Sequence, residues 1–141
     1  MTKHLLGFLA ALGLFAFLAL PASASHDSTP IPVSIGKVSL SNRGQTATVN
    51  VTFTCAVTGG YDVSAQIYQT SGRLLNFGRN WTTGTCVAEE VVTVSVPVTS
   101  QLGIAFKAGP AQVIAGVNQY DTDTWNYFSG ETAQTVRLGK S

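Results

Sequence analysis

Aromatic residues cluster in one polar stretch of the chain and are the strongest candidates for a binding site. Residues 118–130 hold four of them, Tyr120, Trp125, Tyr127 and Phe128. Such rings supply flat contact area, and Tyr and Trp add a polar group that can hydrogen-bond to a ligand. Loops on rigid scaffolds often carry binding sites. We expect Trp125, assisted by Tyr127 and Tyr120, to contact a partner if the rings point outward; turned inward, they would cap the open end of the fold.

A second candidate group mixes aromatic and basic residues within positions 73–81. Its members are Arg73, Phe77, Arg79, Asn80 and Trp81. An outward Trp81 beside Arg79 would support binding of a carbohydrate or a protein. If these aromatic rings fold inward, they serve only to cover the end of the core.

Two carboxylates in the aromatic stretch could bind a cation. Asp121 and Asp123 are two positions apart, and Asn126 follows. Oxygen ligands of this kind suit Ca²⁺. The EF-hand pattern is absent, because its sixth position holds no Gly and its twelfth no Glu. Asp and Thr also form turns without a metal. We therefore interpret the stretch as a turn, keep Asp121 and Asp123 as a weak calcium candidate, and predict no cofactor.

The sequence contains no recognisable catalytic arrangement after residue 24. A Ser–His–Asp or Cys–His arrangement needs a histidine as general base. His26 is the only histidine outside the first 24 residues. Glu89 and Glu90 are adjacent, so on a strand they would point to opposite faces and could not flank a glycosidic bond. We predict that the protein is not an enzyme.

The first 24 residues predict export. A basic start with Lys3 precedes an apolar run over residues 5–20, and Pro21 and the small-residue sequence Ala22-Ser23-Ala24 follow. This order is that of a secretory signal peptide. The 16-residue run falls just below the roughly 17–25 residues of a membrane-spanning helix. We expect cleavage after Ala24 and a secreted, extracellular product; the alternative is retention of the segment as an anchor.

The two cysteines, Cys55 and Cys86, both lie outside the predicted signal peptide. In an exported protein such a pair indicates one disulfide. Their separation of 31 positions corresponds to about 3–4 kcal/mol in the chain-entropy model. A metal site would need more ligands than the chain offers.

Charge is sparse and balanced in the predicted mature chain. Residues 25–141 hold seven basic and seven acidic residues, for a net charge of zero with His neutral. The absence of a basic patch argues against a nucleic-acid partner, and no charged tail is present to bind anionic lipid. We predict one soluble domain over residues 33–141, after a flexible arm at residues 25–32, with no membrane contact once the signal is removed.

Alternating apolar and polar residues predict a strand-rich domain. The clearest strand is residues 46–57, with Val49, Phe53 and Cys55 on one face. We expect a hairpin turn at residues 70–73 and an edge or bulge at Pro97. The remaining strands are predicted at residues 33–40, 62–70, 74–79, 91–98, 102–106, 111–117 and 132–138, with loops at residues 80–90 and 118–130. Seven or eight such strands without a helix are typical of an antiparallel β-sandwich.

This strand pattern over residues 33–138 resembles the immunoglobulin architecture, and the chain is similar to small secreted immunoglobulin-like β-sandwich proteins of bacteria with unassigned function. In those proteins one disulfide joins an early strand to the loop after a hairpin, as Cys55 and Cys86 would here. The resemblance implies an antiparallel immunoglobulin-like β-sandwich and no activity. True immunoglobulin domains have cysteines farther apart that flank a buried Trp, whereas Trp81 lies beside Cys86, so antigen and receptor functions do not carry over.

The leading functional hypothesis is a secreted, non-enzymatic binding or interaction module that uses its loops. Its partner would be an extracellular or cell-surface carbohydrate or protein. One alternative is a structural cell-envelope or matrix protein that acts by self-assembly; another is a small-molecule carrier or an enzyme inhibitor. Exposure of Trp81 and Trp125 would discriminate, because exposed rings favour binding and buried rings indicate only a stable scaffold.

Overall fold

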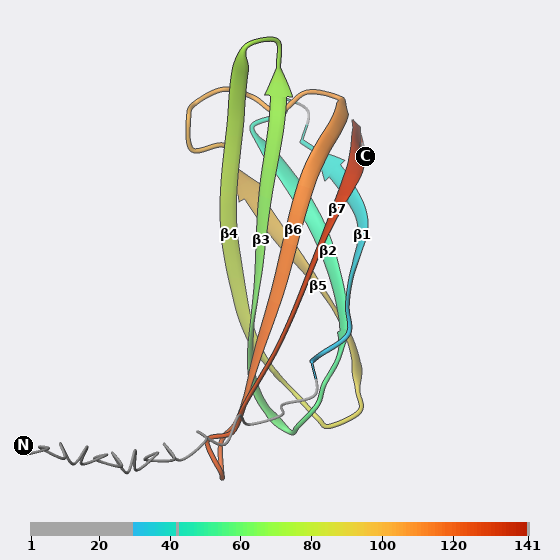
Figure 1. Cartoon of the computed structure of the whole chain (residues 1–141), viewed down its shortest axis with the longest axis vertical. Coiled ribbons are helices and arrows are strands. Elements are labelled where there is room, and N and C mark those ends of the chain that lie inside the picture. Colours follow the sequence, from blue (N-terminus) through green and yellow to red (C-terminus); the bar gives the residue numbers. More distant parts are fainter. Residues whose placement is uncertain (1–29, 42, 141) are drawn as a thin grey trace, which may run out of the picture.

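The protein forms an all-β domain. The computed structural model describes residues 30–41 and 43–140. In this part of the chain it contains no helix, and hence none long and apolar enough to cross a membrane. The seven strands (Figure 1) are β1 (Val33–Leu40), β2 (Thr46–Thr54), β3 (Gly59–Ser71), β4 (Leu74–Cys86), β5 (Val91–Thr99), β6 (Gly109–Asp121) and β7 (Tyr127–Lys140).

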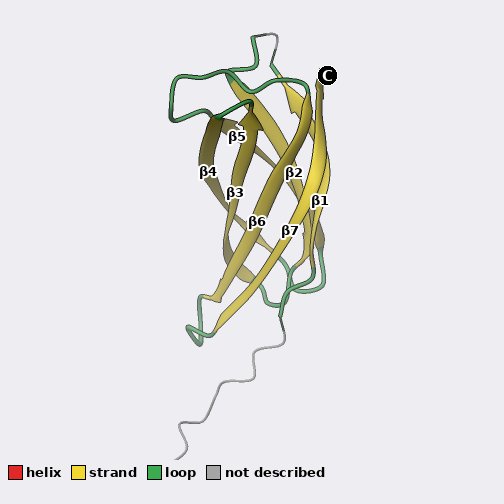
Figure 2. Cartoon of the chain, turned by 45° about the horizontal axis from the view of Figure 1, so that its top comes forward, coloured by secondary structure: helices red, strands yellow, loops and turns green. Residues whose placement is uncertain are grey.

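The strands form one mixed sheet in the order β4-β3-β6-β7-β1-β2-β5. The sheet curls until it is nearly barrel-shaped, so that β2 and β5 lie behind β3 and β6 (Figures 1 and 2). Its two end strands meet at one antiparallel bridge, between Gly78 of β4 and Ser100 just after β5. The expected all-antiparallel pairing is wrong at one seam, where β1 and β7 pair in parallel through Ser39 and Leu40. This contact involves two residue pairs and arises from the curl, so no local pattern could indicate it.

Alternation along the strands produces the core. In β2 the inward residues Ala47, Val49, Val51 and Phe53 are buried, and the polar residues between them are half-buried. β3 and β6 repeat the arrangement, because Val63 and Ile67 are paired with Val117 and Val113 across the sheet and all four are buried. Since a period of two places successive side chains on opposite faces, one face of every strand can fill the interior.

Several strand boundaries differ from those predicted. β4 continues through residues 80–86, where a loop was expected, because it pairs with β3 in unbroken register as far as Cys86 and Gly59. β6 and β7 extend into the expected loop at residues 118–130, of which only residues 122–126 lie outside strands. Residues 102–106 are a loop rather than a strand. Buried side-chain amides form hydrogen bonds with backbone groups in and beside this loop. Asn76 Nδ2 donates to the Ile104 carbonyl (2.7 Å), and Gln69 Oε1 accepts from the Lys107 N–H (2.9 Å).

The core includes a residue that precedes β1. Ile31 is only 4% exposed and joins the core, and its N–H donates to the Ser129 carbonyl (3.0 Å). Of the predicted arm at residues 25–32, the structure describes residues 30–32. The predicted signal peptide at residues 1–24 lies outside the described residues.

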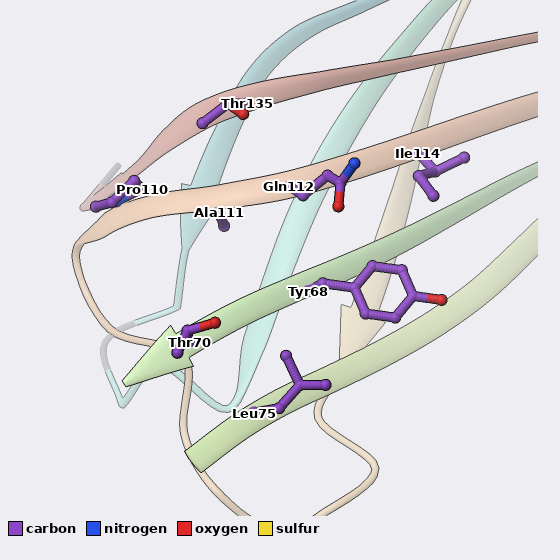
Figure 3. A pocket seen from close by; sticks show the side chains of 8 residues that line it. All are labelled: Tyr68, Thr70, Leu75, Pro110, Ala111, Gln112, Ile114 and Thr135. Atoms are coloured by element: carbon purple, nitrogen blue, oxygen red, sulfur yellow. The ribbon is translucent and has the colours of Figure 1, made fainter. Parts of the chain in front are cut away.

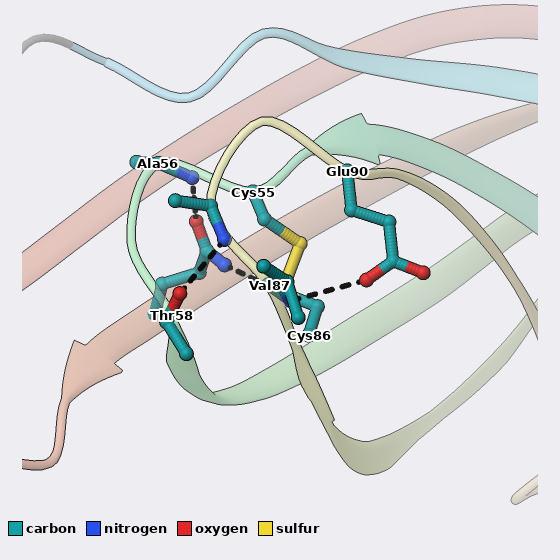
Figure 4. Close-up of a disulfide and its surroundings, with 8 residues drawn as sticks. Cys55, Ala56, Thr58, Cys86, Val87 and Glu90 are labelled. Carbon is teal, nitrogen blue, oxygen red and sulfur yellow. Dashed lines mark hydrogen bonds between the residues drawn. A yellow bond between two sulfur atoms is a disulfide. The ribbon is translucent and has the colours of Figure 1, made fainter.

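The predicted disulfide between Cys55 and Cys86 is present (Figure 4). It ties the residue after β2 to the last residue of β4. Buried Gln119 supports it, because its Nε2 donates to Cys86 Sγ (3.1 Å) and its Oε1 accepts from the Ala56 N–H (2.6 Å). Thr58 and Glu90 accept hydrogen bonds from the backbone N–H groups of Ala88 and Val87 beside it (each 3.0 Å).

Candidate functional site

The outward side of β4, β3, β6 and β7 collects most of the predicted binding residues. We call this surface the outer face. The strand register places Trp81, Ser64, Gly116 and Glu131 in one row across the four strands. The next row is Arg79, Gln66, Ile114 and Ala133. Trp81 is 63% exposed and Arg79 is also exposed, so these two predicted residues share one accessible surface.

Small residues create a hollow in the Trp81 row. Ser64 and Gly116 lie between Trp81 and Glu131, and a depression of about 440 Å³ lies over Gly116, Asn118 and Glu131. Its walls offer a hydroxyl, an amide and a carboxylate. Such groups can hydrogen-bond to a ligand from one side without enclosing it.

A second depression on the outer face holds more apolar side chains (Figure 3). It has a volume of about 590 Å³ and is lined by Tyr68, Leu75 and Ile114, with Gln112 beside them. Tyr68 packs on Phe77 with ring centroids 4.9 Å apart, and its hydroxyl donates to Gln66 Oε1 (3.0 Å). The sequence did not indicate this depression, because its residues come from strands that only the fold brings together. Tyr68 alone could have been found, as an aromatic on the outward side of its strand.

The aromatic group at residues 120–128 is divided between the outer face and the β6–β7 turn. Tyr120 and Tyr127 are paired across β6 and β7, with ring centroids 6.2 Å apart. The ring of Tyr120 lies over Gly60, where any side chain would collide with it. Tyr127 is 67% exposed and Trp125 is 72% exposed. Phe128, in contrast, is half-buried against the core.

The second predicted group is also divided. Phe77, Arg79 and Trp81 alternate along β4 and face outward. Asn80, on the opposite side of β4, donates from Nδ2 to the Pro97 carbonyl (2.7 Å) and thus has a structural role. Arg73 lies in the β3–β4 turn, away from the sheet face, next to Gly72, whose φ of 64° fits the first position of a type II′ hairpin turn.

Trp125 has an unusual backbone conformation. Its φ is 58°, in the left-handed region that favours glycine, and its N–H donates to the Asp121 carbonyl (2.9 Å). The left-handed conformation costs a residue with a Cβ about 1–2 kcal/mol. The turn thus presents a large exposed ring at an energetic cost.

The Asp121 carboxylate organises this turn. One oxygen accepts from the N–H groups of Asp123 (2.8 Å) and Thr124 (3.3 Å), and the other accepts from the Thr124 hydroxyl (2.7 Å). The Thr124 hydroxyl bond, followed by the Asp123 backbone bond, holds the pKa of Asp121 below its ordinary value. Within residues 30–41 and 43–140, no group of three or more His, Cys, Asp or Glu could hold a metal ion. The hydrogen bonds of its carboxylate place Asp121 in the turn that was predicted for this stretch; calcium binding at Asp121 and Asp123 stays a prediction.

The opposite surface of the fold offers a different chemistry. Polar side chains of β2 and β5 bond to one another across the pair, as between Thr52 and Thr93 (2.8 Å) and between Ser95 and Asn50 (2.7 Å). These groups therefore pair with one another. A small depression of about 190 Å³ beside β1 and β2 is lined by Ser34, Thr52 and Thr54.

Comparison with known proteins shows similarity at the level of fold alone. No family model and no curated protein matches the chain. Among solved structures, the chain is similar to the solution structure of AT1g01470 from Arabidopsis thaliana, with a TM-score of 0.51 and 14% identity, over 83% of this chain and 90% of that one. It also matches the solution structure of R. palustris CsgH, with a TM-score of 0.38 and 13% identity, over 72% of this chain and 91% of that one.

Proposed function

We propose that this protein is an exported, non-enzymatic binding module whose partner docks on the outer face and on the β6–β7 turn. The partner is a carbohydrate or a protein of the extracellular space or of a cell surface. The proposal describes the curled sheet as an immunoglobulin-like sandwich of two layers. Strands β4-β3-β6-β7 form the layer that carries the binding site, and β1-β2-β5 form the layer behind it.

The observation that carries the proposal is the state of Trp125. Its side chain is 72% exposed, so the ring gains little from burial, and its φ of 58° makes Trp a costly choice for the backbone. Neither core packing nor turn stability accounts for Trp at this position. Strained residues of this kind often mark functional sites.

The composition of the outer face supports a partner without strong charge. Its exposed groups are mainly aromatic rings, amides and hydroxyls, and the few charged residues, such as Arg79 and Glu131, have opposite signs. Trp, Tyr and Arg are the residue types that contribute most to binding energy at protein interfaces. The same rings and amides suit a sugar, which has an apolar face and a hydrogen-bonding edge.

Export rests on the predicted signal peptide and agrees with the disulfide, since disulfides persist in oxidising compartments. The lowered pKa of Asp121 does not indicate a catalytic role. Perturbed pKa values tend to cluster at catalytic sites, whereas the shift of Asp121 is accounted for by its turn.

The test is a screen of the oxidised protein against glycan and extracellular-protein arrays, followed by affinity measurements with Trp125→Gly and Trp81→Ala. Each variant should weaken binding at least about tenfold, as expected for a central aromatic contact. Glycine adopts the left-handed conformation freely, so Trp125→Gly should unfold at the same or a higher denaturant concentration than the wild type.

Thr48→Ala, on the outward side of β2, is the matched control and should bind as the wild type does. The proposal is wrong if no arrayed ligand binds, or if both tryptophan variants keep wild-type affinity for the ligand that does.

A further inference from the structure

The edge of β4 has backbone groups without a strand partner. β4 pairs with β3 on one side in unbroken register and is an end strand of the sheet. In an antiparallel strand the N–H and C=O of one residue point to the same side, and this side alternates along the chain. The Phe77 carbonyl accepts from the Gln101 N–H (2.9 Å), so the backbone N–H and C=O of Phe77 point away from β3. By alternation, Trp81, Thr83 and Thr85 also direct their backbone groups to the open edge.

Pro97 explains why the curl does not close over these residues. If the antiparallel register of the Gly78–Ser100 bridge continued, Trp81 would lie opposite Pro97. Proline has no N–H to donate, so this pair could not form both of its hydrogen bonds. The Pro97 carbonyl instead accepts from Asn80 Nδ2 (2.7 Å). At the other end, the disulfide joins Cys86 to Cys55. The open stretch therefore lies between two points of closure.

Nothing in the open stretch discourages pairing with another strand. Natural edge strands are commonly protected by charged residues, by proline or by bulges. Residues 80–86 contain neither a charged residue nor a proline, and their register with β3 is free of bulges. Trp81, Thr83 and Thr85 are all exposed.

We propose that a second copy of this chain pairs with this edge, antiparallel and about a two-fold axis at Thr83. In this register Trp81 lies opposite Thr85 of the second copy, Thr85 opposite its Trp81, and Thr83 opposite its Thr83. Each such pair exchanges two backbone hydrogen bonds, for about six in all. Among symmetric registers, the one centred on Thr83 pairs all three of these residues with residues of the same set on the second copy, and an isologous dimer requires such symmetry. Arg79 does not meet its own copy, so no like charges oppose one another.

The dimer would join two outer faces into one continuous surface, with both Trp81 side chains near the seam. The inference is independent of the proposed function, because it depends on backbone groups of β4 and on Pro97, and not on any ligand. It gives a physical basis for the self-assembly suggested by the sequence.

Analytical ultracentrifugation of the purified, oxidised protein across a concentration series tests this inference. The wild type should show a monomer–dimer equilibrium. Thr83→Pro removes the N–H at the two-fold axis; proline is tolerated on an edge strand where the N–H faces away from the sheet, so the monomer should keep its fold. The dissociation constant should rise at least about tenfold. Thr83→Val keeps the N–H and a β-branched side chain, and it should dimerise as the wild type does.

Two further measurements keep the test decisive if Thr83→Pro fails to fold. Thr83→Lys leaves the backbone intact but places two like charges opposite each other at the axis, so it should also weaken the dimer. In the wild type, hydrogen-exchange protection of the Trp81, Thr83 and Thr85 amides should rise with protein concentration. A wild type that stays monomeric at millimolar concentration, or a dimer unaffected by Thr83→Pro and Thr83→Lys, would overturn the inference.

Discussion

Asp121 and Trp125 show how single residues shape the β6–β7 turn. The Asp121 carboxylate accepts three hydrogen bonds, one from Asp123 and two from Thr124, and the Asp121 backbone carbonyl accepts from the Trp125 N–H. Asp121 thus provides most of the turn's hydrogen bonds, and Trp125 occupies its left-handed position. Asp121 therefore stabilises the turn, and Trp125 places an aromatic ring on its surface.

The turn should loosen in acid. The pKa of Asp121 is lowered in the folded protein, so the folded turn favours the ionised carboxylate. Its contribution is fully present above the unfolded pKa of about 3.9 and is lost as the pH falls through the lowered folded value. Amide exchange at Asp123 and Thr124, measured by NMR between pH 2 and pH 7, should accelerate relative to the intrinsic rate in the acid part of this range.

Asp121→Asn separates the charge from the hydrogen bonds of this turn. It keeps an acceptor oxygen and loses the titration, so protection should be weaker at neutral pH and should not change in acid. Asp123→Asn, which changes an exposed neighbour, should leave the wild-type pH response intact. An unchanged acid response in Asp121→Asn would contradict the role given to this carboxylate.

At the scale of elements, β4 determines both the closure of the sheet and its open edge. Its upper part approaches β5 at Gly78, and its lower part diverges because Pro97 cannot continue the ladder. Gly78 permits the approach, since an added Cβ would lie 2.6 Å from the Thr99 carbonyl oxygen and 2.9 Å from Val98 Cγ1.

Gly78→Ala should therefore destabilise the fold, by about 1–3 kcal/mol as for other overpacked sites. Denaturant unfolding followed by tryptophan fluorescence would measure the loss. Gly116→Ala is the matched control, because it also lies in the middle of a strand but its Cβ would approach only the Ser64 hydroxyl oxygen, at 3.1 Å, and one carbonyl oxygen at 3.9 Å. Equal losses in the two variants would show that the approach of β4 to β5 is not the cause.

At the scale of the whole molecule, the curled sheet is held at two places far apart along β4. One is the Gly78–Ser100 bridge, and the other is the disulfide at Cys86. The disulfide acts on the unfolded chain as well, because it closes a loop with a sequence separation of 31.

Replacing both cysteines by alanine should lower the free energy of unfolding by about 3–4 kcal/mol, the chain-entropy value for such a loop. The measurement is equilibrium denaturation of the oxidised protein, the reduced protein and the double variant. The reduced wild type should resemble the double variant. A loss below about 1 kcal/mol would mean that Gln119 and the packed ends of β2 and β4 hold this corner without the covalent bond.

Local patterns predicted the strands better than their ends. The alternation of Val49, Val51 and Phe53 was sufficient to place β2 and its buried face. It was not sufficient for residues 80–86, where polar side chains fall on both sides and the strand exists because β3 pairs with it. Residues 102–106 were wrongly predicted as a strand because of their apolar side chains. Their backbone bonds instead to residues far away in the sequence: the Ile104 carbonyl accepts from Asn76 Nδ2, and the Phe106 N–H donates to the Gly44 carbonyl.

By itself the sequence determined the chemistry of this protein: an all-β chain, two cysteines suited to pairing, and aromatic groups around Trp81 and Trp125 whose exposure the sequence left open. These properties follow from residue type and from spacing along the chain, which are local. Only the tertiary structure decided that Trp81 and Tyr127 share one face, that Pro97 keeps β4 from closing onto β5, and that Trp125 has a left-handed backbone. Each of these depends on strand register and curl, which are set by contacts between residues far apart in the sequence.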